Sequence, residues 1–251
     1  MTKFIHLRNH TEYSLCDGAI KLKKAIALSK DKNIPAVCIT DSHNMFGALE
    51  FSVACCKNGL QPIVGCEVVV DCSNFLFSGS KLVQTNAQKE SCFCKMILLA
   101  KTDDGFLNLI ALISDSYLNR KDGITPNVPI EELEKHNEGL IVLSGGVDGP
   151  IGKAILEKSK NIEEIVKYFK DLFKDDFYIE LQRHGQLNEI ETEPEFINLA
   201  YKYNIPLVAT NDCYFLTKDM FEAQDALSCI AAVKYVSQED RRKLTPEHYF
   251  K

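Results

Sequence analysis

The sequence predicts an α/β fold, a barrel of seven strands that alternate with helices. Short apolar segments of strand length recur along the chain, helical segments separate them, and polar residues follow most of the strands. In a barrel of parallel strands the carboxyl ends meet on one face, so these polar residues would share a site. An open doubly wound sheet is the alternative, although no glycine-rich phosphate loop follows the first predicted strand.

The first predicted strand carries the residues around which the site is expected. Its sequence alternates, so the side chains of Arg8 and His10 point to the same side. Glu67 is a single charge within an apolar, β-rich run, and it needs a partner because an unpaired buried carboxylate is costly. The predicted strands are residues 4–10, 36–40, 62–70, 96–100, 140–144, 177–181 and 206–210.

Helices are predicted between these strands. Leu22, Ala25 and Ile26 recur at helical spacing, and Pro35 ends that helical pattern. The segment 71–94 is polar and irregular, which favours a loop or small hairpin outside the core. The predicted helices are residues 20–32, 47–57, 106–118, 149–173, 188–204 and 218–233.

Composition restricts the class of protein. A chain of 251 residues with 45% hydrophobic content buries a sizeable core, and a net charge of -6 argues against a phosphate-backbone binder. The ten cysteines form no CxxC pair, which predicts reduced thiols rather than disulfides or a zinc knuckle. Without an apolar run of membrane-spanning length or a signal peptide, we expect a cytoplasmic protein and no membrane partner.

A series of motifs runs in order along the chain, including HLRNHTEYSLCDGA (6–19), TDSHNMFGALEF (40–51), PIVGCEV (62–68), YIELQRHG (178–185), PLVATNDCYF (206–215) and LTPEHYFK (244–251). In these motifs and their order the sequence resembles the N-terminal PHP (polymerase and histidinol phosphatase) domain of bacterial DNA polymerase III alpha subunits. The resemblance implies a distorted seven-stranded (β/α)7 barrel over residues 1–215. It also implies that residues 216–251 form a C-terminal helix and the start of a connection to a polymerase palm.

In metal-binding members of this family, side chains at the strand ends hold up to three metals. The resemblance assigns four ligand positions of this sequence to suitable residues, His10, Asp17, Glu67 and Asp212. Five other ligand positions carry unsuitable residues, and His43 and His184 are spare histidines near the proposed face. The five are Arg8, Ser42, Lys95, Gly146 and Tyr214.

These replacements suggest a degenerate site held by ion pairs. Uncompensated carboxylates would repel one another, and Arg8 and Lys95, with His10, supply positive charge at former ligand positions. We therefore expect no catalytic residue in this chain and a buried ion-paired cluster whose net stabilisation is opposed by desolvation. The cluster comprises Arg8, His10, Asp17, Ser42, Glu67, Lys95, Asp212 and Tyr214. His136 and His248 are expected to be surface residues.

Three functions compete. The first is a structural and docking domain of a replicative polymerase, with no cofactor of its own and magnesium in a palm domain outside this chain. Its implied partners are the palm, thumb and fingers and a proofreading exonuclease subunit, with DNA bound mainly through those other domains. The second is a residual phosphoesterase, a 3'–5' exonuclease or pyrophosphatase, with zinc or manganese on the four suitable ligands. The third, a stand-alone histidinol-type phosphatase, is disfavoured by LTPEHYFK.

Overall fold

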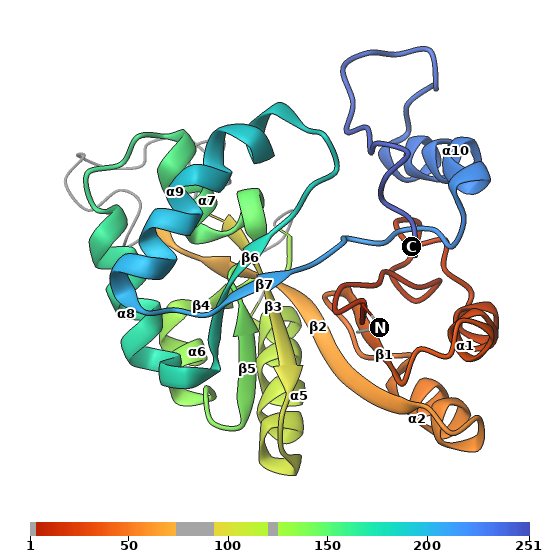
Figure 1. Ribbon diagram of the computed structural model, residues 1–251, viewed down its shortest axis with the longest axis horizontal. Coiled ribbons are helices and arrows are strands. Elements are labelled where there is room, and N and C mark those ends of the chain that lie inside the picture. Colours follow the sequence, from red (N-terminus) through yellow and green to blue (C-terminus); the bar gives the residue numbers. More distant parts are fainter. Residues whose placement is uncertain (1–3, 74–92, 120–124) are drawn as a thin grey trace. The chain divides into compact units, whose positions relative to one another are not determined.

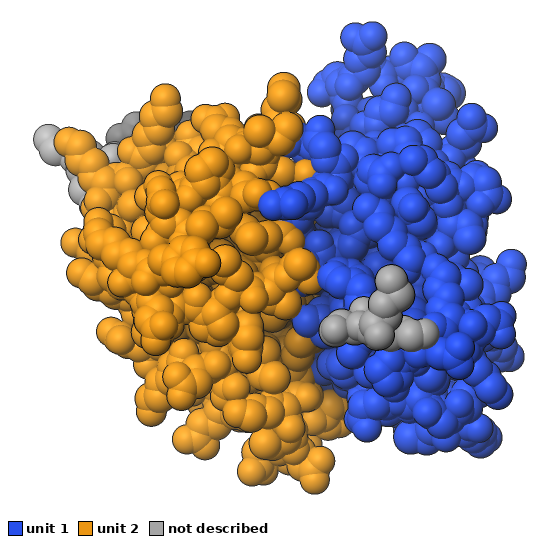
Figure 2. All heavy atoms as spheres, in the orientation of Figure 1, with its two compact units in different colours: residues 1–66, 182–186, 210–251 blue, residues 67–181, 187–209 orange. Residues whose placement is uncertain are grey.

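The computed structural model describes residues 4–73, 93–119 and 125–251 of an α/β protein (Figure 1). The chain divides into two compact units (Figure 2). Unit 1 comprises residues 1–66, 182–186 and 210–251, and unit 2 comprises residues 67–181 and 187–209. The predicted end of the barrel at residue 215 is a different kind of boundary and stays a prediction.

Unit 1 is built on three helices and a buried strand. Leu22 and Ile26 of α1 pack with Val37 of β1 and Phe51 of α2, while Ala25 of α1 joins a second apolar cluster. Helical spacing therefore confirms the first predicted helix and its buried stripe. The elements are α1 (Leu22–Asp31), β1 (Ala36–Ser42), α2 (Ala48–Lys57), the 3-10 turn η3 (Lys218–Met220) and α10 (Phe221–Ala232), with β2 (Gln61–Asp71) beginning in this unit.

The prediction of a regular strand at residues 4–10 is wrong. This segment forms an isolated parallel bridge between Asn9 and Cys213, with no strand ladder over its described residues. The Asn9 amide donates to the Thr40 hydroxyl, 2.9 Å away, so a side chain takes a bond that a neighbouring strand would supply. The segment is nevertheless held firmly, because the Thr40 amide donates back to the Asn9 carbonyl at 3.1 Å.

Unit 2 contains the mixed part of the sheet. The hydrogen-bonded order is β1-β2-β3-β5-β6-β7, with β4 beside β2. β5 is parallel to β6 and β6 to β7, but β3 and β5 are antiparallel, so the prediction of an all-parallel sheet is wrong. The strands are β3 (Phe93–Ala100), β4 (Val128–Pro129), β5 (Leu140–Leu143), β6 (Phe177–Leu181) and β7 (Leu207–Ala209).

The connection from β3 to β5 contains more than the one predicted helix. This connection holds α5 and also β4 and α6, two elements that the sequence analysis did not predict. Helix α5 packs on β3 and β5 (Figure 1).

Apart from α6, the helices of unit 2 follow the predicted pattern with one difference. The segment predicted as one helix over residues 149–173 forms two, separated at Lys158, whose φ of 52° is incompatible with a right-handed helix. The helices are α5 (Asp103–Leu118), α6 (Ile130–Lys135), α7 (Pro150–Leu156), α8 (Ile162–Phe173) and α9 (Leu187–Tyr203), with 3-10 turns η1 (Gly146–Asp148) and η2 (Lys174–Asp176).

Other expectations meet the structure in part. Most of the loop predicted at residues 71–94 lies outside the described residues. The cysteines within the described ranges are all free thiols, as their spacing predicted. Among the same residues, none of the helices combines the length and the apolar character that crossing a bilayer requires.

Candidate functional site

Backbone pairing in unit 1 aligns Arg8 and His10 with Asp212. The Cys213 amide donates to the Arg8 carbonyl at 3.1 Å, and the His10 amide donates to the Cys213 carbonyl at 2.8 Å. These bonds hold residues 8–10 alongside residues 212–213 in the parallel direction. Alternation of side chains then places those of Arg8 and His10 on the side of Asp212.

Both oxygens of Asp212 are engaged by cationic or imidazole groups. Arg8 Nε lies 3.1 Å from Oδ1, and Nη2 donates to Oδ2 at 3.2 Å. His10 Nε2 lies 2.9 Å from Oδ1 and donates its proton there. The Arg8 side chain is 2% exposed and that of Asp212 13%, so this is a buried ion pair with one hydrogen bond from Nη2 and a close contact from Nε.

His10 is fixed on its other sides by Ser42 and Tyr214. The Ser42 hydroxyl lies 3.2 Å from His10 Nδ1, which completes the hydrogen bonds of the ring. The rings of His10 and Tyr214 stack with centroids 4.2 Å apart and planes 7° apart. Ser42 and Tyr214, two residues at expected ligand positions, thus fix the imidazole of His10 by a hydrogen bond and by stacking.

Asp17 meets a cation that the sequence analysis placed elsewhere. Arg242 Nη1 lies 3.1 Å from Asp17 Oδ1, and Arg242 Nη2 donates to the Tyr214 hydroxyl at 2.8 Å. The guanidinium carbon lies 5.1 Å from the centre of the Tyr214 ring. Arg242, predicted to belong to a connection toward other domains, therefore supplies the positive charge beside Asp17. The side-chain amide of Gln224 donates to the backbone carbonyl of Asp17.

Glu67 and Lys95 form an ion pair within unit 2. Lys95 Nζ lies 2.8 Å from Glu67 Oε1, and the two side chains are 24% and 1% exposed. β2 and β3 carry them and are neighbours in the sheet, which explains the meeting of residues 28 positions apart. The partner required by a carboxylate in an apolar strand is thus a lysine.

The two spare histidines differ in their surroundings. His184 is buried, and its Nε2 accepts a hydrogen bond from the Asp212 amide at 3.3 Å. Its ring stacks on that of His248, with centroids 3.8 Å apart. The prediction of a surface position for His248 is wrong, because the residue is 3% exposed and the Tyr214 amide donates to its backbone carbonyl. His43 is half-buried with a φ of 57°.

Two further buried carboxylates, those of Asp41 and Glu180, accept hydrogen bonds that the sequence did not predict. Asp41 accepts hydrogen bonds from the Thr11 amide at 2.6 Å, the Thr11 hydroxyl at 2.7 Å and the Ser14 hydroxyl at 2.5 Å. Burial raises the pKa of Asp41, and these hydrogen bonds oppose the rise. Glu180 in unit 2 accepts from the Gly145 amide at 2.6 Å. A charge inside an apolar strand, the signal used for Glu67, would have found Glu180.

Arginine and lysine side chains pair with the three carboxylates that the resemblance assigned to a metal. A divalent cation would need the carboxylates of Asp17, Glu67 and Asp212, and each has an arginine or lysine nitrogen within 3.2 Å. These positive charges lie beside carboxylate oxygens and disfavour a further cation there. We therefore derive no metal-dependent step from these residues.

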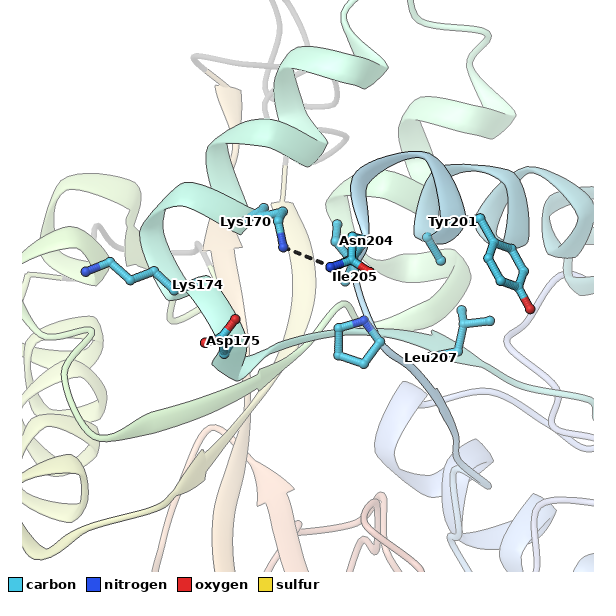
Figure 3. Close-up of a pocket in the computed structure, with 9 residues that line it drawn as sticks. Lys170, Lys174, Asp175, Tyr201, Asn204, Ile205 and Leu207 are labelled. Atoms are coloured by element: carbon cyan, nitrogen blue, oxygen red, sulfur yellow. Dashed lines mark hydrogen bonds between the residues drawn. The ribbon is translucent and has the colours of Figure 1, made fainter.

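A separate pocket of about 490 Å³ lies in unit 2 (Figure 3). It is bordered by the C-terminal ends of α8 and α9 and by the start of β7, including Tyr201 and Leu207. Lys170 Nζ donates to the Asn204 carbonyl at 3.1 Å and caps the end of α9. Neither Glu67 nor Lys95 lines this pocket, so it is distinct from their ion pair.

Comparison with known proteins settles the family. A profile of the PHP domain matches residues 6–184. The chain belongs to the PHP domain family. The DNA polymerase III subunit alpha of Caulobacter vibrioides is 40% identical over 250 residues, which are 99% of this chain and 21% of that protein. The corresponding subunit of Vibrio cholerae is 32% identical over 252 residues, 99% of this chain and 20% of that protein.

This PHP domain spans about a fifth of the length of those relatives. An amidohydrolase structure from Chromobacterium violaceum, with bound sulfate and no metal, superposes with a TM-score of 0.51. The superposition covers 84% of this chain and 87% of the amidohydrolase chain, at 12% sequence identity. A likeness at that identity supports the fold, and the expected PHP-type α/β architecture is confirmed.

Proposed function

We propose that this chain is the N-terminal PHP domain of a bacterial DNA polymerase III alpha subunit, and that it acts as a structural and docking domain without hydrolytic activity of its own. The observation that carries the second part is the pairing of Asp17, Glu67 and Asp212 with Arg242, Lys95 and Arg8. Matches over nearly the whole chain to named alpha subunits support the first part.

In this proposal, ion pairs perform the cross-linking that a metal performs in an active relative. The Arg8–Asp212 pair joins segments 204 residues apart, and the Lys95–Glu67 pair joins two neighbouring strands. Such pairs position strand ends, and removal of one partner leaves a buried charge without compensation. The expected partners are the palm, thumb and fingers of the longer polypeptide and a separate proofreading exonuclease subunit.

The chemistry of the full enzyme would lie outside this chain. A polymerase transfers a deoxynucleotide to a primer 3' end with magnesium held by palm carboxylates, and DNA would be bound mainly through those domains. The net charge of -6 is consistent with a minor direct role in DNA binding. A cytoplasmic location follows from this role in replication.

Metal analysis joined to a nuclease assay tests the proposal. The chain is purified without chelator, its zinc, manganese and iron are quantified, and 3'–5' degradation of labelled single-stranded DNA is followed with added Mn²⁺ or Zn²⁺. We expect no stoichiometric metal bound through His10 or Asp212 and no degradation above that of an Asp212→Asn variant. Metal that is lost with Asp212→Asn, together with DNA degradation, would establish the residual phosphoesterase instead.

Docking is tested with the exonuclease subunit of the same bacterium. Size-exclusion chromatography of the mixed proteins, and of the exonuclease with a full-length alpha subunit, should give co-elution in both cases. Co-elution with the full-length subunit alone would place the docking surface outside this domain.

A further inference from the structure

A second group of metal-ligating side chains lies in unit 2, apart from the ion pairs described above. Asp115 of α5, Glu132 of α6 and His136, the C-cap residue of α6, each offer one ligand atom, and these atoms lie within 4.8 Å of one another. All three residues are half-buried. Glu132 and His136 are four residues apart, which places them on one face of the helical turn.

The hydrogen bonds of Asn108 orient the imidazole of His136. Asn108 Nδ2 donates to the Glu138 carbonyl at 3.0 Å, which fixes the amide so that Oδ1 is the atom 3.2 Å from His136 Nδ1. An amide oxygen accepts, so His136 Nδ1 carries the proton and Nε2 keeps its lone pair. Metal-binding histidines have this arrangement, with the second ring nitrogen donating to an oxygen that sets the tautomer.

The charges around the group favour a cation. Asp115 lies in the last turn of α5, where the helix dipole disfavours a carboxylate and where no residue is basic. Lys135 Nζ lies 2.7 Å from Glu132 Oε1, but its side chain is 63% exposed, and an exposed pair of this kind is weak. Two carboxylates thus face one readily displaced ammonium group.

We propose that Asp115, Glu132 and His136 form a binding site for a divalent transition metal, with Zn²⁺ as the best match, that ties α5 to α6. Two carboxylate oxygens, one imidazole nitrogen and a water make a tetrahedral zinc site. Ligand atoms around tetrahedral zinc are about 3.4 Å apart, so side-chain rotation closes the present spacing. The site is independent of the proposed function, because it shares no residue with the ion pairs.

Titration of the metal-free chain with ZnCl2 by calorimetry, and with CoCl2 by visible absorption, tests the proposal. We expect one saturable site with the absorption of tetrahedral Co²⁺. Asn108→Ala should weaken binding by about 10- to 100-fold through loss of ring orientation, and His136→Ala should weaken it at least as much. Lys135→Ala should tighten it, because the competing ammonium group is removed.

Matched variants separate this site from other metal sites. His43→Ala removes a half-buried histidine of unit 1, and Asp212→Asn removes a carboxylate of the ion-paired set; both should leave zinc affinity unchanged. Circular dichroism of each variant shows whether it folds, and Asp115→Asn provides a second ligand variant that keeps the side-chain volume. Absence of saturable binding, or binding unchanged by both His136→Ala and Asp115→Asn, would overturn the proposal.

Discussion

Replacement of Arg8 gives the most direct test of the ion-paired interior of unit 1. Arg8→Met keeps most of the apolar stem and removes the guanidinium, so Asp212 retains His10 as its partner at 2.9 Å. Two charge-assisted contacts at 3.1 and 3.2 Å are lost from a side chain that is 2% exposed. Removal of one partner from a buried pair costs about 3 to 5 kcal/mol, a large part of the stability of a typical domain.

Urea denaturation followed by circular dichroism measures this loss. Asp212→Asn and the double variant complete a cycle, and the double variant should be more stable than the sum of the single changes predicts, because the charge left alone is removed as well. Lys101→Met, which breaks an exposed pair with Asp176, is the matched control and should cost less than about 1 kcal/mol. A loss below about 1 kcal/mol for Arg8→Met, with no coupling in the cycle, would refute the reasoning.

Three further predictions concern other residues. Lys95→Met should lower the free energy of unfolding by about 3 kcal/mol, since the side chain of Glu67 is 1% exposed. In urea titrations, adding Glu67→Gln to this variant should restore part of the lost free energy. A Lys95→Met variant as stable as the parent would contradict a buried pair. Burial lowers the pKa of His6 from 6.5 to about 4, so the unfolded chain binds the proton more readily than the folded chain. Between pH 6.5 and pH 4 this difference should lower the free energy of unfolding by about 3 kcal/mol. Urea denaturation of His6→Gln at the two pH values should show a smaller decrease. Gly145→Ala should lower the melting temperature more than Gly185→Ala. Both glycines have a φ of 81°, but a Cβ at Gly145 would lie 1.9 Å from the Lys95 carbonyl oxygen. Equal melting temperatures of the two variants would contradict this geometry.

Local patterns predicted most of the secondary structure. The stripe of Leu22, Ala25 and Ile26 predicted α1, and the apolar runs predicted β1, β2, β3, β5, β6 and β7 within a few residues. The short elements β4 and α6 were missed because two and six residues carry too little periodicity. Residues 4–10 alternate like a strand, yet strand pairing needs a neighbouring backbone, and Thr40 offers a side chain instead.

The pairing of charges was predictable in kind but not in partner. The sequence predicts that Glu67 and Lys95 are charged residues of an ion-paired cluster, and the two side chains form an ion pair with each other. Arg242 was not among the predicted residues of the cluster, because a basic residue near the C-terminus looks like solvated surface until residues 248–250 pair with residues 214–215. His248 was misjudged for the same reason, since burial of a polar ring depends on what packs over it.

The sequence by itself determined the α/β class, the positions of most helices and strands, and the family; the resemblance also predicts that Arg8, Lys95 and Tyr214 stand at ligand positions. These features depend on residue type and on spacing along the chain. The tertiary structure alone decided the antiparallel β3–β5 pair, the Asp17–Arg242 pair and the meeting of Asp115, Glu132 and His136. Each of these joins segments distant in sequence, and their distance in space is set by packing of the whole unit, which no local pattern records.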